Sequence, residues 1–121
     1  MTLKLLDTRK LHSAMRPLLS EAREEDARND PAHARHPYFH PVTVLTDSGR
    51  KVSAFSRDLS VRGIGLMHEQ SLPLDEVEIT ISTGRGYCVK VRTRMTWCKP
   101  CGDGFYLSGG VFASVPIFDE N

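Results

Sequence analysis

The feature that most constrains the fold is an alternation of apolar and polar residues across the second two-thirds of the chain. Residues 77–81, Val-Glu-Ile-Thr-Ile, show it most clearly, and a period of two is typical of a β-strand with one buried face. The same period recurs in six short segments: 42–46, 52–56, 64–68, 77–81, 87–97 and 105–111. Glycine-containing turns lie at 47–49, 84–86 and 99–104. Few helical signals separate the segments, so the sequence predicts a mainly β domain, either an antiparallel barrel or a sandwich.

The first 30 residues follow a helical period instead. Residues 8–28 are rich in Ala, Leu, Glu and Arg, which favour a helix. An apolar stripe recurs at three- and four-residue intervals and consists of Leu11, Met15, Leu18, Leu19 and Ala22. Pro17 removes an internal hydrogen bond and is expected to kink the helix or end a first turn. The stripe can pack on the chain's own domain or on a second subunit, and its short length favours the first.

These patterns divide the chain into four parts. They are an N-terminal helical segment at 1–30, a polar linker at 31–37, a β domain at 38–115 and a C-terminal tail at 116–121. A length of 121 residues suits one domain that buries a core without disulfides. The three cysteines are an odd number, which does not indicate a disulfide scaffold.

The charge balance excludes some classes of partner. The formal net charge is +1, so no overall field attracts a nucleic acid polymer or a membrane, and neither is expected as a partner. A basic strand face of Lys90, Arg92 and Arg94 is either a solvent side or a local anion-attracting surface. The N-terminal residues contain no apolar run long enough for a signal core or a membrane span, so a cytoplasmic location is expected. The sequence leaves monomer and homodimer open.

The segment 57–66, Arg-Asp-Leu-Ser-Val-Arg-Gly-Ile-Gly-Leu, holds the most informative group of polar residues. A carboxylate such as Asp58 can accept from the two N–H donors on a guanine edge. The Ser60 hydroxyl can donate and accept, and Gly63 permits a positive φ and close approach of a ligand to the backbone. Arg57 and Arg62 add planar cations that grip phosphate or stack on a base. The alternative interpretation is a purely structural one, because a tight β connection uses the same residue types.

This segment resembles the Asp/Asn-x-Ser-x-x-Gly motif of the PilZ domain family, whose members bind cyclic di-GMP. Asp58, Ser60 and Gly63 occupy the motif positions after the second predicted strand, as in the family. The later Ser-Gly-Gly-Val-Phe at 108–112 is similar to the end of the family's last barrel strand. The resemblance extends from Arg35 to near Val115. It implies a six-stranded antiparallel β-barrel preceded by an N-terminal α-helix.

The chain departs from the family at its second motif, Arg-x-x-x-Arg, which lies just before the first strand. Arg35 is the one arginine available there. In one register Pro31 stands at the other arginine position, and in the alternative register Phe39 does. Losing one charge-assisted phosphate contact costs about 1.5–3 kcal/mol of binding free energy. Residues that partly compensate for charge or stacking are His33, His36, His40, Tyr38 and Phe39, although barrel-end packing is the simpler role for the last two.

Other chemistry finds less support in the sequence. Cys98 and Cys101 form a single C-x-x-C pair at a predicted turn, and Cys88 lies ten residues before Cys98. A structural zinc site needs four ligands, and one such pair provides only two. No HExxH, Gly-x-Ser-x-Gly or Walker pattern occurs, so no catalytic residue, metal or cofactor is expected, and the protein is not expected to be an enzyme.

Two functional hypotheses follow. In the first, the chain is a cyclic di-GMP sensor in which Asp58 binds a guanine edge and Ser60 and Arg35 bind phosphate or base. Gly63 then provides backbone geometry, with Arg57 or Arg62 as support. In the second, the chain is a degenerate PilZ domain that does not bind nucleotide and instead binds an unknown protein partner through its helix or barrel surface.

Overall fold

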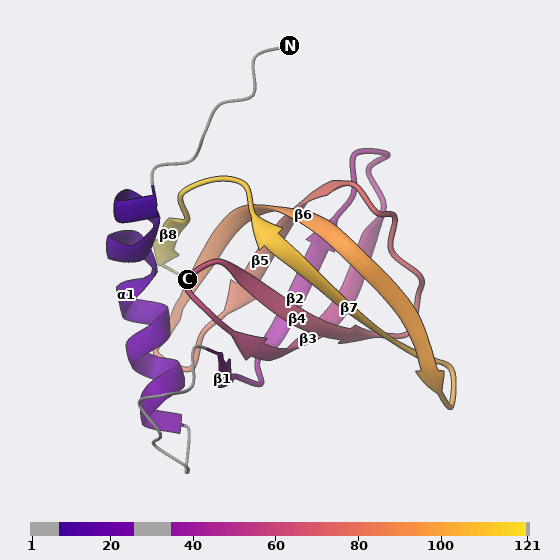
Figure 1. The fold of residues 1–121 in the computed structure, drawn as a ribbon, viewed down its shortest axis with the longest axis horizontal. Helices are drawn as coiled ribbons and strands as arrows, with labels where there is room; N and C mark the ends of the chain where they lie inside the picture. Colours follow the sequence, from indigo (N-terminus) through magenta and orange to yellow (C-terminus); the bar gives the residue numbers. More distant parts are fainter. Residues whose placement is uncertain (1–7, 26–34, 121) are drawn as a thin grey trace.

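A closed β-barrel forms the centre of the molecule in the computed structural model, which describes residues 8–25 and 35–120 (Figure 1). The barrel strands are β2 (Pro41–Leu45), β3 (Lys51–Leu59), β4 (Gly63–His68), β5 (Glu76–Ser82), β6 (Tyr87–Gly102) and β7 (Phe105–Phe112). They are antiparallel in the order β3-β2-β5-β6-β7-β4, and pairing of β3 with β4 closes the ring. The prediction of a six-stranded antiparallel barrel with an N-terminal helix is therefore confirmed.

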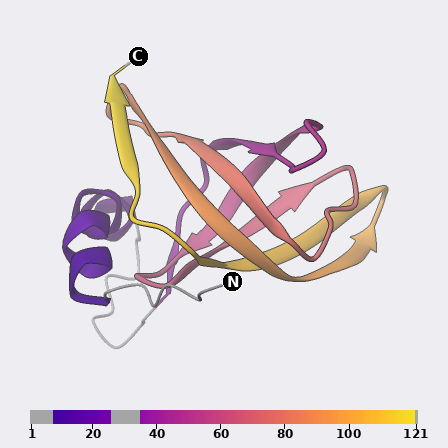
Figure 2. The same ribbon diagram turned by 90° about the horizontal axis from the view of Figure 1, so that it is seen from above.

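Two further strands lie outside this ring. The two-residue strand β1 (His36–Pro37) pairs with the end of β3 and falls in the segment predicted as a linker. Strand β8 (Ile117–Glu120) falls in the predicted C-terminal tail and pairs with the first residues of β6 (Figure 2). The predicted turn at 99–104 is shorter than expected, because positive φ angles at Gly102, Asp103 and Gly104 close a tight hairpin and β6 continues to Gly102.

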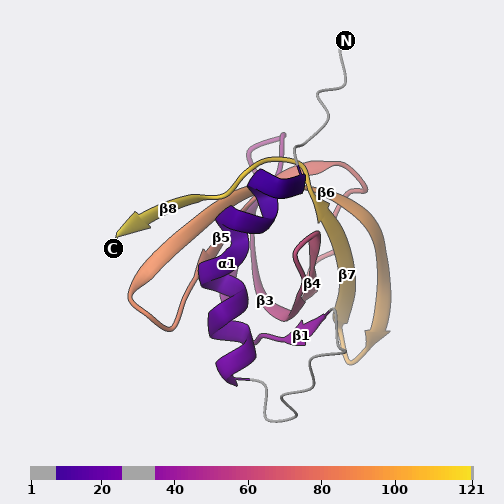
Figure 3. The same cartoon turned by 60° about the vertical axis from the view of Figure 1, so that its left-hand side comes forward.

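Helix α1 (Thr8–Glu25) lies across one end of the barrel, as Figures 1 and 3 show from two directions. Its buried apolar side chains belong to the same hydrophobic cluster as the barrel core, and they are Met15, Leu18, Leu19 and Ala22. The helix does not end at Pro17, which lies inside it. Burial of these apolar side chains offsets the backbone hydrogen bond that Pro17 removes. The helix thus packs on its own barrel, and it is not apolar enough over its length to cross a bilayer.

The barrel interior is filled by alternate side chains of each strand. Strand β5 shows the pattern plainly, because Val77, Ile79 and Ile81 are fully buried between partly exposed neighbours. A smaller set of polar side chains also faces inward, and its members are Ser56, His68, Thr93 and Ser108. The barrel is thus a packed core, and a ligand site must lie on its outer surface or at its ends.

Candidate functional site

A β-bulge in β3 turns Asp58 to the outside of the barrel. Val52, Ala54 and Ser56 face inward, and unbroken alternation would place Asp58 inward as well. The pairing of β3 with β4 shifts by one residue between Ser56 and Asp58, so Arg57 is the extra residue of a bulge. Asp58 consequently faces solvent with a partly exposed side chain, and the next residue in the chain is fully buried.

A second bulge, in β6, turns Trp97 outward in the same way. Strand β6 points Thr93 and Met95 into the core, and alternation predicts the same for Trp97. The register with β7 shifts between Met95 and Trp97, which makes Thr96 the extra residue. Trp97 is therefore 40% exposed on the outer face. The alternation of residues 87–97 places Trp97 on the apolar face of the strand, because no residue in the segment signals a bulge.

Two glycines form the floor between these side chains. Across the sheet, Asp58 pairs with Gly65, Gly65 with Gly109, and Gly109 with Trp97. A Cβ on Gly65 would lie 2.7 Å from the Asp58 carboxylate, and a Cβ on Gly109 would overlap the Trp97 indole. The carboxylate and the indole thus lie directly over two adjacent strands, which are about 4.8 Å apart in a sheet.

A pocket of about 280 Å³ occupies this surface. The residues around it are Arg35, Asp58, Ile64, Gly65, Thr96, Trp97, Gly109, Gly110 and Val111. Its volume lies near the lower limit of the roughly 300–1,000 Å³ found for small-molecule sites, which suits a single planar base better than a whole dinucleotide. The Thr96 hydroxyl donates to the Gly109 carbonyl at 3.1 Å and so helps to fix the bulge that forms one wall.

Arg35 joins the site through an ion pair with Asp58. Strand β1 follows Arg35 directly, and its two residues pair with Leu59 and Asp58, which brings the guanidinium over the pocket. The side chains of Arg35 and Asp58 are 50% and 26% exposed. A solvent-exposed pair of this kind contributes only about 0–1 kcal/mol, so a ligand that binds both groups can separate them at small cost.

The other predicted site residues do not line the pocket, and they are Ser60, Gly63, Arg57 and Arg62. Ser60 is buried, and its hydroxyl accepts from the backbone N–H of Gly63 at 3.1 Å, so it fixes the turn between β3 and β4. Gly63 does not adopt the positive φ that a glycine permits, because the positive-φ residues are elsewhere in the described chain. Gly63 is instead required by close packing, since a Cβ there would overlap the Gly110 carbonyl oxygen. Arg57 and Arg62 are exposed, and neither lines the pocket.

The second arginine position of the family motif has no counterpart in the pocket. Pro31 and His33 lie outside the described residues. Phe39 is exposed and stacks on Phe55 with ring centroids 5.0 Å apart, away from the pocket lining. Tyr38 is 1% exposed and packs in the core, which is the simpler of its two expected roles. Arg35 is thus the arginine of the described linker residues that reaches the site.

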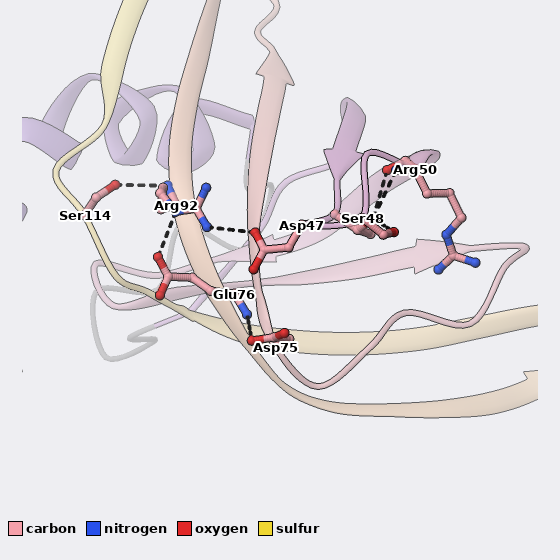
Figure 4. Close-up of polar contacts among 8 residues, drawn as sticks. Asp47, Ser48, Arg50, Asp75, Glu76, Arg92 and Ser114 are labelled. Atoms are coloured by element: carbon pink, nitrogen blue, oxygen red, sulfur yellow. Dashed lines mark hydrogen bonds and ion pairs between the residues drawn. The ribbon is translucent and has the colours of Figure 1, made fainter. Parts of the chain in front are cut away.

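The two arginines on the basic face of β6, Arg92 and Arg94, have different surroundings. The Arg92 Nε donates to Glu76 Oε1 at 2.7 Å, and its Nη2 lies 3.4 Å from Asp47 Oδ1 (Figure 4). The hydrogen bond with Glu76 is the largest effect raising the pKa of Arg92. Arg94 is exposed and lies opposite Val111, which lines the pocket. Arg92 is therefore engaged by carboxylates, whereas Arg94 adds positive charge beside the pocket.

Cysteine and metal chemistry has no assembled site in the described part of the chain. Cys88, Cys98 and Cys101 all lie in β6, and Cys101 is exposed. Among the described residues, no group of three or more His, Cys, Asp or Glu side chains is arranged to hold a metal ion.

Comparison with known proteins identifies the fold. No family model and no curated protein matches the chain. Among solved structures, the chain is similar to the Bacillus subtilis inhibitor of motility MotI/DgrA, a PilZ-domain protein, with a TM-score of 0.57 and 9% sequence identity. The match covers 71% of this chain and 44% of that chain, so this chain spans less than half the length of the protein it resembles. At this identity the likeness concerns architecture alone, and the chain has a PilZ-like fold.

Proposed function

We propose that the protein is a cyclic di-GMP sensor whose pocket holds one guanine base between Asp58 and Trp97. The observation that carries this proposal is the pair of bulges that turns a carboxylate and an indole outward over the same glycine floor. The protein is proposed to act as a cytoplasmic, non-enzymatic adaptor, either as a monomer or as a homodimer.

Each pocket group has a role that suits a guanine nucleotide. The Asp58 carboxylate accepts from the N1–H and N2–H donors of the base, a contact that adenine does not offer. The Lys99 ammonium lies over the Trp97 ring, 5.5 Å from its centroid, and a base that displaces it can stack on the indole. Such stacking contributes about 1–3 kcal/mol per base in single-stranded nucleic acid complexes. Arg35 leaves its ion pair with Asp58 and binds a phosphate, for which its planar guanidinium is well suited. Arg94 adds attraction for the anion.

Calorimetric titration of the full chain with cyclic di-GMP tests this proposal. We expect saturable binding, with affinity reduced about 10- to 100-fold in Asp58→Ala and in Arg35→Ala, because each loses a contact to a charged group. Asp119→Ala removes an exposed carboxylate on β8 and is the matched control, with unchanged affinity. Cyclic di-AMP should bind at least tenfold more weakly than cyclic di-GMP, because the Asp58 contact is lost.

Trp97 gives an independent measurement, because it is the single tryptophan of the chain. Stacking of a base on its indole should quench the fluorescence with the same Kd as the calorimetric titration. Absence of heat at tens of micromolar ligand would reject the sensor and leave the protein-interaction module as the proposal. Binding that persists within twofold in both Asp58→Ala and Arg35→Ala would reject the residue assignment.

A further inference from the structure

Helix α1 carries a buried carboxylate that the proposed ligand site does not use. Glu21 is 4% exposed, and both of its oxygens have a partner from another part of the chain. The Tyr38 hydroxyl donates to Oε2 at 2.7 Å, and the Gly84 backbone N–H donates to Oε1 at 2.7 Å. A buried carboxylate is costly unless it is hydrogen-bonded, so these contacts decide how α1 sits on the barrel.

Tyr38 connects this carboxylate to the bulge that turns Asp58. Its side chain is buried against α1, while its backbone N–H donates to the Arg57 carbonyl at 3.0 Å. Its own carbonyl accepts from the Ser56 hydroxyl at 2.6 Å. Ser56 and Arg57 are the two residues before Asp58, and Arg57 is the extra residue of the bulge. One residue therefore contacts both the helix and the backbone that presents the ligand carboxylate.

Strand β1 lies between two contacts that hold the chain, one made by Arg35 and one made by Tyr38. It has only two residues, so its pairing with β3 provides little support by itself. Tyr38 holds the chain immediately after β1, and the ion pair of Arg35 with Asp58 holds the chain immediately before it. Loss of the contact at either end of β1 should therefore shift the strand and weaken the contact at its other end.

We propose that Glu21 and Tyr38 are positioning residues that couple docking of α1 to occupancy of the pocket, an inference that rests on the proposed function. With α1 docked, Tyr38 holds β1 in place and Arg35 stays over the pocket. A ligand that bridges Arg35 and Asp58 holds β1 more firmly than their exposed ion pair does, and so it stabilises the docked helix. Because such coupling is reciprocal, the undocked state binds the ligand more weakly by the same factor by which the ligand stabilises docking.

Hydrogen exchange of the α1 amides, with and without ligand, tests the coupling. Tyr38→Phe removes one hydrogen bond to the buried carboxylate, so α1 exchange should accelerate about tenfold, and saturating cyclic di-GMP should slow that exchange less than it does in the wild type. Glu21→Gln should keep both properties near wild type, because its amide oxygen accepts from Gly84 and its NH₂ group donates to the Tyr38 hydroxyl. Tyr106→Phe is the matched control in β7, where the same chemical change should alter neither property.

The outcomes separate the two proposals. Saturating cyclic di-GMP should slow α1 exchange about fivefold in the wild type and less in Tyr38→Phe. If cyclic di-GMP slows α1 exchange in Tyr38→Phe as much as in the wild type, the two residues only hold the helix and the coupling is overturned. If the wild type binds no ligand, the proposed function fails, and the coupling is judged on the ligand-free protein. There Asp58→Ala should accelerate α1 exchange about threefold through loss of the surface pair, and an unchanged rate would overturn the coupling.

Discussion

At the scale of single residues, His68 organises the polar groups inside the barrel. It is 2% exposed, and its Nδ1 lies 2.6 Å from the Gln70 carbonyl oxygen, which can only accept. Nδ1 therefore carries the proton, and Nε2 accepts from the Ser108 hydroxyl at 2.7 Å. The ring also stacks on Tyr106. Both nitrogens of the neutral ring are thus satisfied, so the interior suits the neutral ring.

Burial lowers the pKa of His68 below its ordinary 6.5, and the Gln70 hydrogen bond opposes this shift only in part. Below pH 6.5 the unfolded chain therefore binds a proton at this residue before the folded chain does. The free energy of unfolding should be highest above pH 6.5 and should decrease as the pH falls. Urea unfolding at pH 7.5, 6.5 and 5.5 measures this dependence. His68→Phe should be less stable at pH 7.5, because Ser108 loses its partner. Its free energy of unfolding should also depend less on pH than that of the wild type. An equal pH dependence in the two proteins would contradict the assignment of this effect to His68.

At the scale of elements, the alternation in the sequence predicts the strands well and their bulges not at all. Val77, Ile79 and Ile81 are buried as their period requires, because β5 is regular. Asp58 was singled out for its chemistry, but its outward direction depends on the extra residue Arg57. Trp97 was missed because the bulge at Thr96 reverses the face that simple alternation assigns. A one-residue shift in register reverses every later side chain, and ordinary residues can form it.

Helix α1 provides a prediction about packing. Leu18 is fully buried between the helix and the barrel, and Leu74 is 65% exposed in the connection before β5. Leu18→Ala should lower the free energy of unfolding by about 2–5 kcal/mol, because it leaves a cavity in the shared core. Leu74→Ala, the same substitution at the surface, should change it by about 0.5 kcal/mol or less. Denaturant unfolding of both variants measures the difference, and similar values for the two would show that α1 does not share the core.

At the scale of the whole molecule, helix and barrel share one hydrophobic cluster. The buried residues of α1 and those of β2 to β7 form a single cluster, which also contains Tyr38 from the segment between them. Glu21 adds hydrogen bonds from α1 to Tyr38, which precedes β2, and to Gly84, which lies in the turn between β5 and β6. Elements that bury the same apolar surface lose most of their stability when separated, so the chain should unfold as one unit.

Two optical signals of the same protein can test this cooperativity. Far-UV circular dichroism at 222 nm reports mainly the single described helix, and fluorescence of Trp97 reports the outer face of β6. Denaturant titration should give the same midpoint for both signals, because loss of the shared core removes the helix and the barrel together. Leu18→Ala should move both midpoints by the same amount, since the cavity weakens the whole unit. A helix signal that disappears at lower denaturant than the tryptophan signal would show instead that α1 is a separate element, which also removes the basis for coupling it to the pocket.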